Sequence, residues 1–369
     1  MQIETQDRLL LGPGPSSVYP EVLKAMATPL VGHLDGYFLK VMSDMQNMLR
    51  QVFQTGNELT LAMSGTGSAG METVLVNILE PGDKVLIGIC GVFGQRMKDV
   101  AQRCGAQVLT VEAPWGHAIR PEQVEAVLKA TPGIVAVALV HAETSTGVHQ
   151  PLADISRLVH DYGALFIVDA VTSLGGIDVE VDNWHIDACY SGTQKCLSAP
   201  PGLAPVTLNT AAMNKVKNRK SKVQSWYLDL NMIANYWGEE RFYHHTAPIS
   251  MIFGLHEALR LLLAEGLQHS FSRHEENGRY LQEQLQDMGF ELFAEEGYRL
   301  PELTSVLIPD RYNEGRLRNQ LLEQYGIEVG GGLGALKGKA WRIGLMGYTS
   351  KHGNAVLLLE AVKELLLKS

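Results

Sequence analysis

The chain has 369 residues, of which 46% are hydrophobic and 19% are charged, which is the composition of a folded protein rather than a disordered one. It carries 31 lysines and arginines against 40 aspartates and glutamates, a formal charge of -9, which argues against general nucleic-acid binding. No apolar run approaches a membrane span, and the acidic start does not resemble a signal peptide. The length predicts two domains.

Short apolar strands alternate with amphipathic helices along the first two-thirds of the chain. The sequence predicts strands at 59–64, 81–89, 106–113, 133–143, 164–171 and 186–192. It predicts helices at 70–80 and 94–105, and two more that start near Pro121 and Pro151. Continuous apolar strands between helices indicate a mostly parallel sheet that is covered on both faces.

The pattern changes after about Pro248. A long helix is predicted to end at Gly266, and a second helix runs toward Gly289. Strands at 303–310, 327–334 and 339–347 and helices at 315–326 and 355–369 follow, which indicates a smaller α+β domain. We therefore expect an N-terminal segment at 1–20, a large domain at 21–250 and a small domain at 251–369.

A glycine-rich turn follows the first strand of the large domain. The stretch from Gly65 to Gly70 fits G-x-G-x-x-G, and a glycine turn at a helix N-terminus binds phosphate through free N–H groups and the helix dipole. A dinucleotide site also needs an acid at the end of the next strand, and residues 88–91 contain none. The motif therefore predicts a phosphate site, with an ordinary strand-to-helix turn as the alternative.

Two ionisable residues stand at the ends of other predicted strands. Asp169 follows an apolar run, so its carboxylate needs a partner: an arginine, a helix N-terminus or a protonated ring nitrogen. Lys195 lies between Ser-Gly-Thr-Gln and Pro-Pro-Gly. The carboxyl ends of parallel strands share one crevice, so the phosphate turn, the acid and the lysine predict a pocket for pyridoxal phosphate.

These motifs resemble the class V aminotransferases of the aspartate aminotransferase superfamily, and most closely the alanine–glyoxylate and serine–pyruvate/glyoxylate enzymes. The resemblance is carried over nearly the whole chain by "LLLGPGP", "SGTGSAGMETVLVNILEPGD", "ETSTGV", "VDAVTSLGG", "YSGTQKCLSAPPG", "YHHTAP" and "WRIGLMGY". It implies the α/β fold of the type I pyridoxal phosphate enzymes, with a large mostly parallel sheet and a smaller α+β domain. It also implies that Lys195 is the Schiff-base lysine and Asp169 the partner of the pyridine nitrogen.

The resemblance assigns further cofactor contacts by position, at Thr66, Gly67, Ser68, Phe93, Thr144, Gln194, Tyr243 and Thr246. The first three form the phosphate turn, where the family commonly has histidine in place of Ser68. Phe93 stacks on the pyridine ring, where relatives often have tryptophan. Thr144 lies near the cofactor hydroxyl and Gln194 contacts the phosphate.

Tyr243 and Thr246 reach the phosphate of a neighbouring subunit in the family, which implies a homodimer. The resemblance makes Arg342 the residue that grips the substrate carboxylate, and it places Gly14 and Gly32 near the substrate. The residues themselves also single out Arg342, because it interrupts an apolar strand and needs an anion. A substrate carboxylate and an internal salt bridge are equally consistent with that position.

The sequence therefore predicts a pyridoxal-phosphate-dependent aminotransferase that acts on alanine or serine and on glyoxylate or pyruvate. The rivals are a cysteine desulfurase, a cofactor-binding protein of another enzyme complex without turnover, and, more weakly, a nicotinamide dehydrogenase. All four cysteines lie at or before Cys196, whereas a desulfurase needs a loop cysteine in the second half. No cysteine spacing indicates a metal site, and we expect a cytoplasmic protein.

Overall fold

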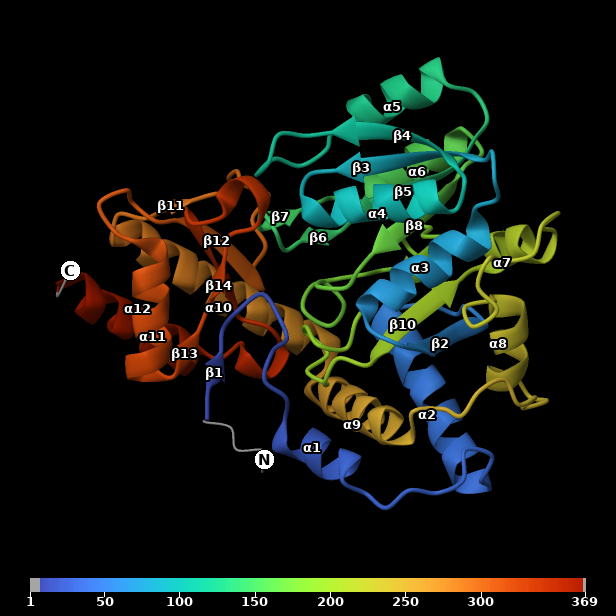
Figure 1. Ribbon diagram of the computed structural model, residues 1–369, viewed down its shortest axis with the longest axis horizontal. Helices are drawn as coiled ribbons and strands as arrows, with labels where there is room; N and C mark the ends of the chain where they lie inside the picture. Colours follow the sequence, from blue (N-terminus) through green and yellow to red (C-terminus); the bar gives the residue numbers. More distant parts are fainter. Residues whose placement is uncertain (1–6, 368–369) are drawn as a thin grey trace.

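The computed structural model describes residues 7–367, and its largest element is a seven-stranded sheet (Figure 1). The strands in spatial order are β2 (Leu59–Ser64), β10 (Leu203–Leu208), β9 (Ala188–Tyr190), β8 (Leu165–Asp169), β5 (Ile134–Val140), β3 (Lys84–Ile89) and β4 (Gln107–Glu112). β10 runs antiparallel to both of its neighbours, and every other adjacent pair is parallel. The predicted α/β fold with a mostly parallel sheet is confirmed.

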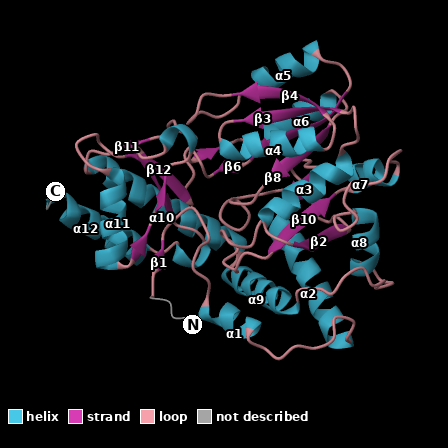
Figure 2. Cartoon of the chain, viewed as in Figure 1, coloured by secondary structure: helices cyan, strands magenta, loops and turns pink. Residues whose placement is uncertain are grey.

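Helices surround this sheet, as Figure 2 shows. They are α1 (Pro20–Met26), α2 (Gly36–Phe53), α3 (Gly67–Ile78), α4 (Val92–Arg103), α5 (Pro121–Ala130), α6 (Ala153–Asp161), α7 (Thr210–Lys217), α8 (Leu230–Trp237) and α9 (Ile249–Glu265). Because helices cover both faces, the central strands are mainly apolar: six of the seven residues of β5 are buried, whereas the edge strand β4 is mostly not. No helix within residues 7–367 is both long enough and apolar enough to cross a membrane.

A smaller antiparallel sheet forms the C-terminal part of the chain. Its strands in spatial order are β11 (Glu291–Leu292), β12 (Leu303–Leu307), β15 (Ala340–Gly344) and β14 (Gly330–Gly331). The helices α10 (Leu267–Asp287), α11 (Glu314–Tyr325) and α12 (His352–Leu367) share a hydrophobic cluster with this sheet. The expected strand–helix pattern of this region is confirmed.

The N-terminal strand belongs to the smaller part of the structure. β1 (Leu9–Leu10) pairs in parallel with β13 (Ile327–Glu328), and Leu11 is buried in the C-terminal hydrophobic cluster. The sequence did not reveal this pairing. Residues 1–6 of the expected N-terminal segment lie outside the described residues.

The long helix α9 ends at Gly266 as predicted. Its buried side chains belong to the hydrophobic cluster of the large sheet, and those of α10 belong mainly to the C-terminal cluster. The division of the domains at 250/251 stays a prediction.

The topology brings five loops to one edge of the large sheet. Because β2, β3, β5, β8 and β9 all point the same way, the residues that follow them leave the sheet at the same edge. A last short ladder, β6 (Ala142–Glu143) with β7 (Val148–His149), extends one of these loops. This edge carries the site described below.

Gly278 shows how closely α10 approaches the chain that leads into β12. A Cβ atom at this position would lie 2.6 Å from the Cα atom of Pro301, whereas a Cβ at Gly353 in α12 would meet no atom within 4 Å. We predict that Gly278→Ala lowers the free energy of unfolding by ~1–3 kcal/mol, because the backbone must move. Gly353→Ala should leave the free energy of unfolding unchanged or raise it slightly. Denaturation curves of the two variants would contradict this if they coincided.

Candidate active site

One pocket at the carboxyl edge of the large sheet collects most of the residues that the sequence singled out. Eight of them line it: Thr66, Gly67, Ser68, Phe93, Thr144, Asp169, Gln194 and Lys195. They come from the loops after β2, β3, β5, β8 and β9. Residues that are up to 129 positions apart in the chain, such as Thr66 and Lys195, therefore face a common space.

The glycine-rich turn opens α3 toward this pocket. Thr66 has an extended backbone at the N-cap of α3, and its side chain makes no capping hydrogen bond. Gly67 is buried, and a Cβ there would lie 3.2 Å from Val171 on the loop after β8. The N–H groups and the dipole of the helix start therefore face the pocket without a side-chain acceptor, which suits an anionic group such as phosphate.

Asp169 ends β8 and is 3% exposed. Its carboxylate accepts hydrogen bonds from the backbone N–H of Val171 at 2.9 Å and from the hydroxyl of Tyr190 at 2.8 Å. Burial raises the pKa of Asp169 to about 6, although these two hydrogen bonds act in the opposite direction. The positive charges of Lys195 and Arg96 also lower its pKa, but neither residue hydrogen-bonds to the carboxylate among residues 7–367, so a direct cationic partner would hold it ionised more firmly.

Lys195 also lines the pocket and is 7% exposed. Burial, followed by the positive charge of Arg342, lowers the pKa of its amine to about 8. The amine donates a hydrogen bond to the carbonyl oxygen of Pro13. Gly14 has a φ of +98°, and a Cβ there would lie 2.6 Å from Cδ of the lysine, so this position needs glycine. The N-terminal segment thus packs directly on the lysine.

Glu143 is a buried acid that the sequence reasoning missed. It accepts hydrogen bonds from the N–H of Phe93 at 3.1 Å and from the hydroxyl of Ser145 at 2.6 Å. Its carboxylate therefore sits at the N-terminus of α4 and anchors the residue that carries the aromatic ring. An acid directly after an apolar strand was the available signal, the same one that marked Asp169.

Arg96 and Tyr190 were also missed. Arg96 lines the pocket, its guanidinium lies 4.8 Å from the ring centre of Phe93, and it donates to the hydroxyl of Ser68 at 3.4 Å. Tyr190 is the β9 neighbour of Asp169 in the parallel register. Neither role could be read from spacing, because both depend on which strands and loops are adjacent.

Arg342 lies on β15, 8% exposed, and approaches the pocket from the smaller sheet. Its Nε donates to the carbonyl oxygen of Gly331 at 2.8 Å, and its Nη1 to that of Thr144 at 3.4 Å. Among residues 7–367, no carboxylate forms an ion pair with it. The internal salt bridge considered for this arginine is therefore not found, and its guanidinium is available to an external anion.

Tyr243 and Thr246 lie outside the lining of this pocket. Both are exposed on the segment before α9, and the ring of Tyr243 lies 5.2 Å from that of His33. Gly32 is exposed on the neighbouring N-terminal loop. Their expected contributions to a cofactor or substrate site stay predictions.

The residues of the pocket fit pyridoxal phosphate. The helix start at Thr66 has no side-chain acceptor, and Asp169 forms no ion pair among residues 7–367. A phosphate ester would supply an acceptor for the helix start, and a protonated ring nitrogen would supply a charged donor for Asp169. Gln194 lines the same pocket, where its amide nitrogen could donate to the phosphate.

Comparison with known proteins points to one family. The family model described as "Aminotransferase class-V" matches residues 9–353. Alanine--glyoxylate aminotransferase of Callithrix jacchus is 42% identical over 97% of this chain and 87% of that protein. (S)-ureidoglycine--glyoxylate transaminase of Bacillus subtilis is 40% identical over 98% of this chain and 91% of that protein. The crystal structure of alanine--glyoxylate aminotransferase from Nostoc sp. covers 99% of this chain and 97% of that one, with 48% identity and a TM-score of 0.97.

The raised pKa of Asp169 predicts how the stability of the cofactor-free protein depends on pH. The pKa rises from an ordinary 3.8 to about 6, so folding favours the protonated acid. The protonated acid therefore adds ~3 kcal/mol to the free energy of unfolding below pH ~4. This stabilisation is lost as the pH rises through ~6. Asp169→Asn removes this dependence, so the variant should gain stability relative to the original chain between these two pH values. Guanidinium denaturation across this range measures the difference, and parallel stability curves would contradict the prediction.

Proposed function

This chain belongs to the class V aminotransferases, and we propose that it transfers the amino group of alanine or serine to glyoxylate or pyruvate with the help of pyridoxal phosphate. Both named relatives carry glyoxylate in their names, which supports glyoxylate as the amino acceptor. The observation that carries the proposal is the single pocket in which an unpaired helix N-terminus, buried Asp169 and buried Lys195 face one another.

We propose that Thr66, Gly67, Ser68 and Gln194 hold the phosphate, that the ring of Phe93 stacks on the cofactor, and that Thr144 lies near its hydroxyl. When bound, pyridoxal phosphate supplies an electron-accepting ring that stabilises negative charge at the substrate Cα. Asp169 would bind the ring nitrogen and favour its protonated form, and as an ion pair its own carboxylate would stay ionised.

Lys195 has two tasks in this proposal. Its amine would hold the cofactor covalently, and once the substrate is bound the freed amine would take up and return the proton at the substrate Cα. With a pKa of about 8, a useful fraction of the amine is neutral near pH 7, whereas an ordinary lysine would be almost fully protonated. Burial in the pocket thus prepares the amine for proton transfer.

Arg342 binds the α-carboxylate of the substrate. Its guanidinium has no acidic partner among residues 7–367 and can make a two-point contact with a carboxylate. Gly14, which packs on Lys195, leaves room beside the reacting amine. A single clamp of this kind suits small substrates that carry one carboxylate.

The rival functions are less well supported. The four cysteines are Cys90, Cys104, Cys189 and Cys196; all are buried, so none is the exposed loop thiol that a desulfurase requires. A cofactor-binding protein without turnover would have no need for an arginine held ready for an anion beside the lysine.

Two further features belong to the proposal. We expect a homodimer, in which exposed Tyr243 and Thr246 of one subunit complete the phosphate site of the other. We also expect a cytoplasmic location, which the four unpaired, buried cysteines support.

The function can be tested with the purified protein and a panel of amino donors and acceptors. We predict visible absorption from bound cofactor, attachment of the cofactor to Lys195 after borohydride treatment, and formation of alanine's or serine's keto acid when glyoxylate is supplied. Lys195→Ala should lose the attachment and at least ~100-fold in kcat. Attachment to another lysine, or absence of keto acid with every donor, would refute the proposal.

The role of Arg342 can be separated from that of the cofactor. Arg342→Ala should lower kcat/KM for amino donor and keto acid alike by ~100-fold or more, because both use one carboxylate clamp, while the visible spectrum stays unchanged. Arg342→Lys should recover little, since a point charge cannot reproduce the planar fork. Loss of the cofactor absorption, or unfolding with normal substrate kinetics in the folded fraction, would instead make Arg342 a structural residue.

The dimer can be tested through the cofactor. Tyr243→Phe combined with Thr246→Ala should weaken cofactor binding by ~10-fold or more through lost hydrogen bonds to the phosphate, without changing the subunit mass seen in sedimentation. A fully active monomer in sedimentation and kinetic assays would contradict the shared site.

A further inference from the structure

Two backbone segments that follow residues of the site contact each other. One is the turn that carries Lys195; the other follows β15, the strand that carries Arg342. The N–H of Tyr348 donates to the hydroxyl of Ser198 at 2.7 Å, and the N–H of Ser198 donates to the carbonyl oxygen of Lys195 at 3.0 Å. Gly347 lies at this contact with a φ of +53°, and a Cβ there would meet the carbonyl oxygen of Cys196 at 2.6 Å. The two segments thus touch without any space between them.

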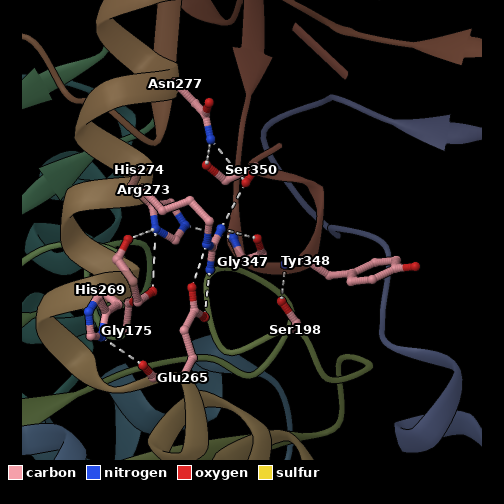
Figure 3. Close-up of polar contacts among 11 residues, drawn as sticks. Gly175, Ser198, Glu265, His269, Arg273, His274, Asn277, Gly347, Tyr348 and Ser350 are labelled. Carbon is pink, nitrogen blue, oxygen red and sulfur yellow. Dashed lines mark hydrogen bonds and ion pairs between the residues drawn. The ribbon is translucent and has the colours of Figure 1, made fainter. Parts of the chain in front are cut away.

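His274 of α10 contacts the second of these segments at Gly347 (Figure 3). Its Nε2 accepts a hydrogen bond from the N–H of Gly347 at 2.8 Å, and its Nδ1 donates to the carbonyl oxygen of Ser270 at 2.7 Å. Both ring nitrogens are therefore used, and the neutral tautomer is set by the two partners. Burial and the charge of Arg273 lower the pKa of His274 to about 4, so Nε2 keeps its lone pair at neutral pH.

Arg273 binds the same segment through its carbonyl groups. Its Nη1 donates to the oxygens of Gly347 and Ser350, each at 2.9 Å. Its positive charge is balanced by Glu265 at the end of α9, in a two-point contact of 2.6 and 2.9 Å. Asn277, one turn further along α10, donates to the oxygen of Ser350 at 3.1 Å. Figure 3 shows these contacts running along one face of α10.

The peptide groups of Gly347 are thus held on both sides by adjacent residues of one helix. The N–H goes to His274 and the C=O to Arg273. Within residues 7–367, His274 is the only acceptor for the N–H of Gly347. Because Gly347 is buried, loss of this contact would leave the N–H unpaired among those residues. His274 is itself fully buried, so water cannot easily replace it.

We infer that His274 is a positioning residue: by accepting the N–H of Gly347, it holds the segment after Arg342 against the turn of Lys195 and so sets the distance between the substrate clamp and the reacting amine. This inference rests on the proposed function, because it assigns His274 to the same site. His274 touches neither residue and acts through Gly347, Tyr348 and Ser198.

The charge of Arg342 makes this distance measurable without substrate or cofactor. After burial, that charge is the largest cause of the lowered pKa of the Lys195 amine. If the segment after β15 moves away, the guanidinium recedes and water enters, and both changes raise the pKa of Lys195. A residue that only stabilised the fold would leave this pKa unchanged in the folded protein.

The test compares variants of the cofactor-free full chain. His274→Leu removes the acceptor, and His274→Gln places an amide oxygen near the position of Nε2 to restore it. His269→Gln is the control, because His269 lies on the same helix, is exposed and contacts only the carbonyl oxygen of Glu265. The pKa of Lys195 is read from the pH dependence of its reaction with an acylating reagent, followed by mass spectrometry.

We expect the Lys195 pKa to stay near that of the original chain in His269→Gln and His274→Gln, and to rise in His274→Leu so that proton affinity increases ~10-fold or more. In the loaded enzyme, His274→Leu should lose ~10-fold or more in kcat, while His274→Gln stays within ~3-fold. His274→Asn, whose amide is too short to reach Gly347, should behave like the leucine variant and serves if that variant does not fold.

A lower melting temperature of His274→Leu or His274→Asn, with an unchanged Lys195 pKa and unchanged kinetic constants in the folded fraction, would overturn the inference. Failure of His274→Gln to restore the pKa would also overturn it. Because the pKa is measured without substrate or cofactor, a chain that transaminated no donor would refute the proposed function and leave this result standing.

Discussion

Burial of two opposite ionisable groups at one edge of the large sheet is the constraint on which the rest of the structure depends. Water is excluded from both, which raises the pKa of Asp169 and lowers that of Lys195. Each group is held by neutral partners: a tyrosine hydroxyl and a peptide N–H for the acid, a peptide carbonyl for the lysine. The pocket is therefore poised for a ligand that brings the missing charges.

Keeping the lysine buried requires contributions from distant parts of the chain. Gly14 covers its side chain, and Ser16 donates to the carbonyl oxygen of Lys195 at 2.8 Å. The same N-terminal segment then joins the smaller sheet region through β1 and β13. On the other side, the segment after β15 contacts Ser198. The lysine turn thus lies between the N-terminal segment and the segment after β15. Arg342, on β15, approaches the pocket through its contact with Thr144.

Much of the fold could be predicted because its elements have local causes. Short apolar runs between helices, such as that of β5, indicate strands that are covered on both faces, and all but one residue of β5 is buried. The helix-stop signal at Gly266 likewise marks the end of α9. The lining of the pocket followed in part from a topological rule: residues after parallel strands meet at one edge. Thr66, Asp169 and Lys195 could therefore be grouped before their positions in space were known.

The sequence by itself determined the residue types that the chemistry needs, namely a glycine turn, an acid, a lysine and an arginine, because these are properties of short local motifs and of resemblance to a family. Only the tertiary structure decided their partners. Tyr190 meets Asp169 through strand register, Glu143 anchors Phe93 across two loops, and His274 reaches Gly347 from a helix 73 residues away in the chain. Such contacts depend on the packing of one element against another, and hydrogen bonds between residues far apart in sequence leave no periodic signal along the chain.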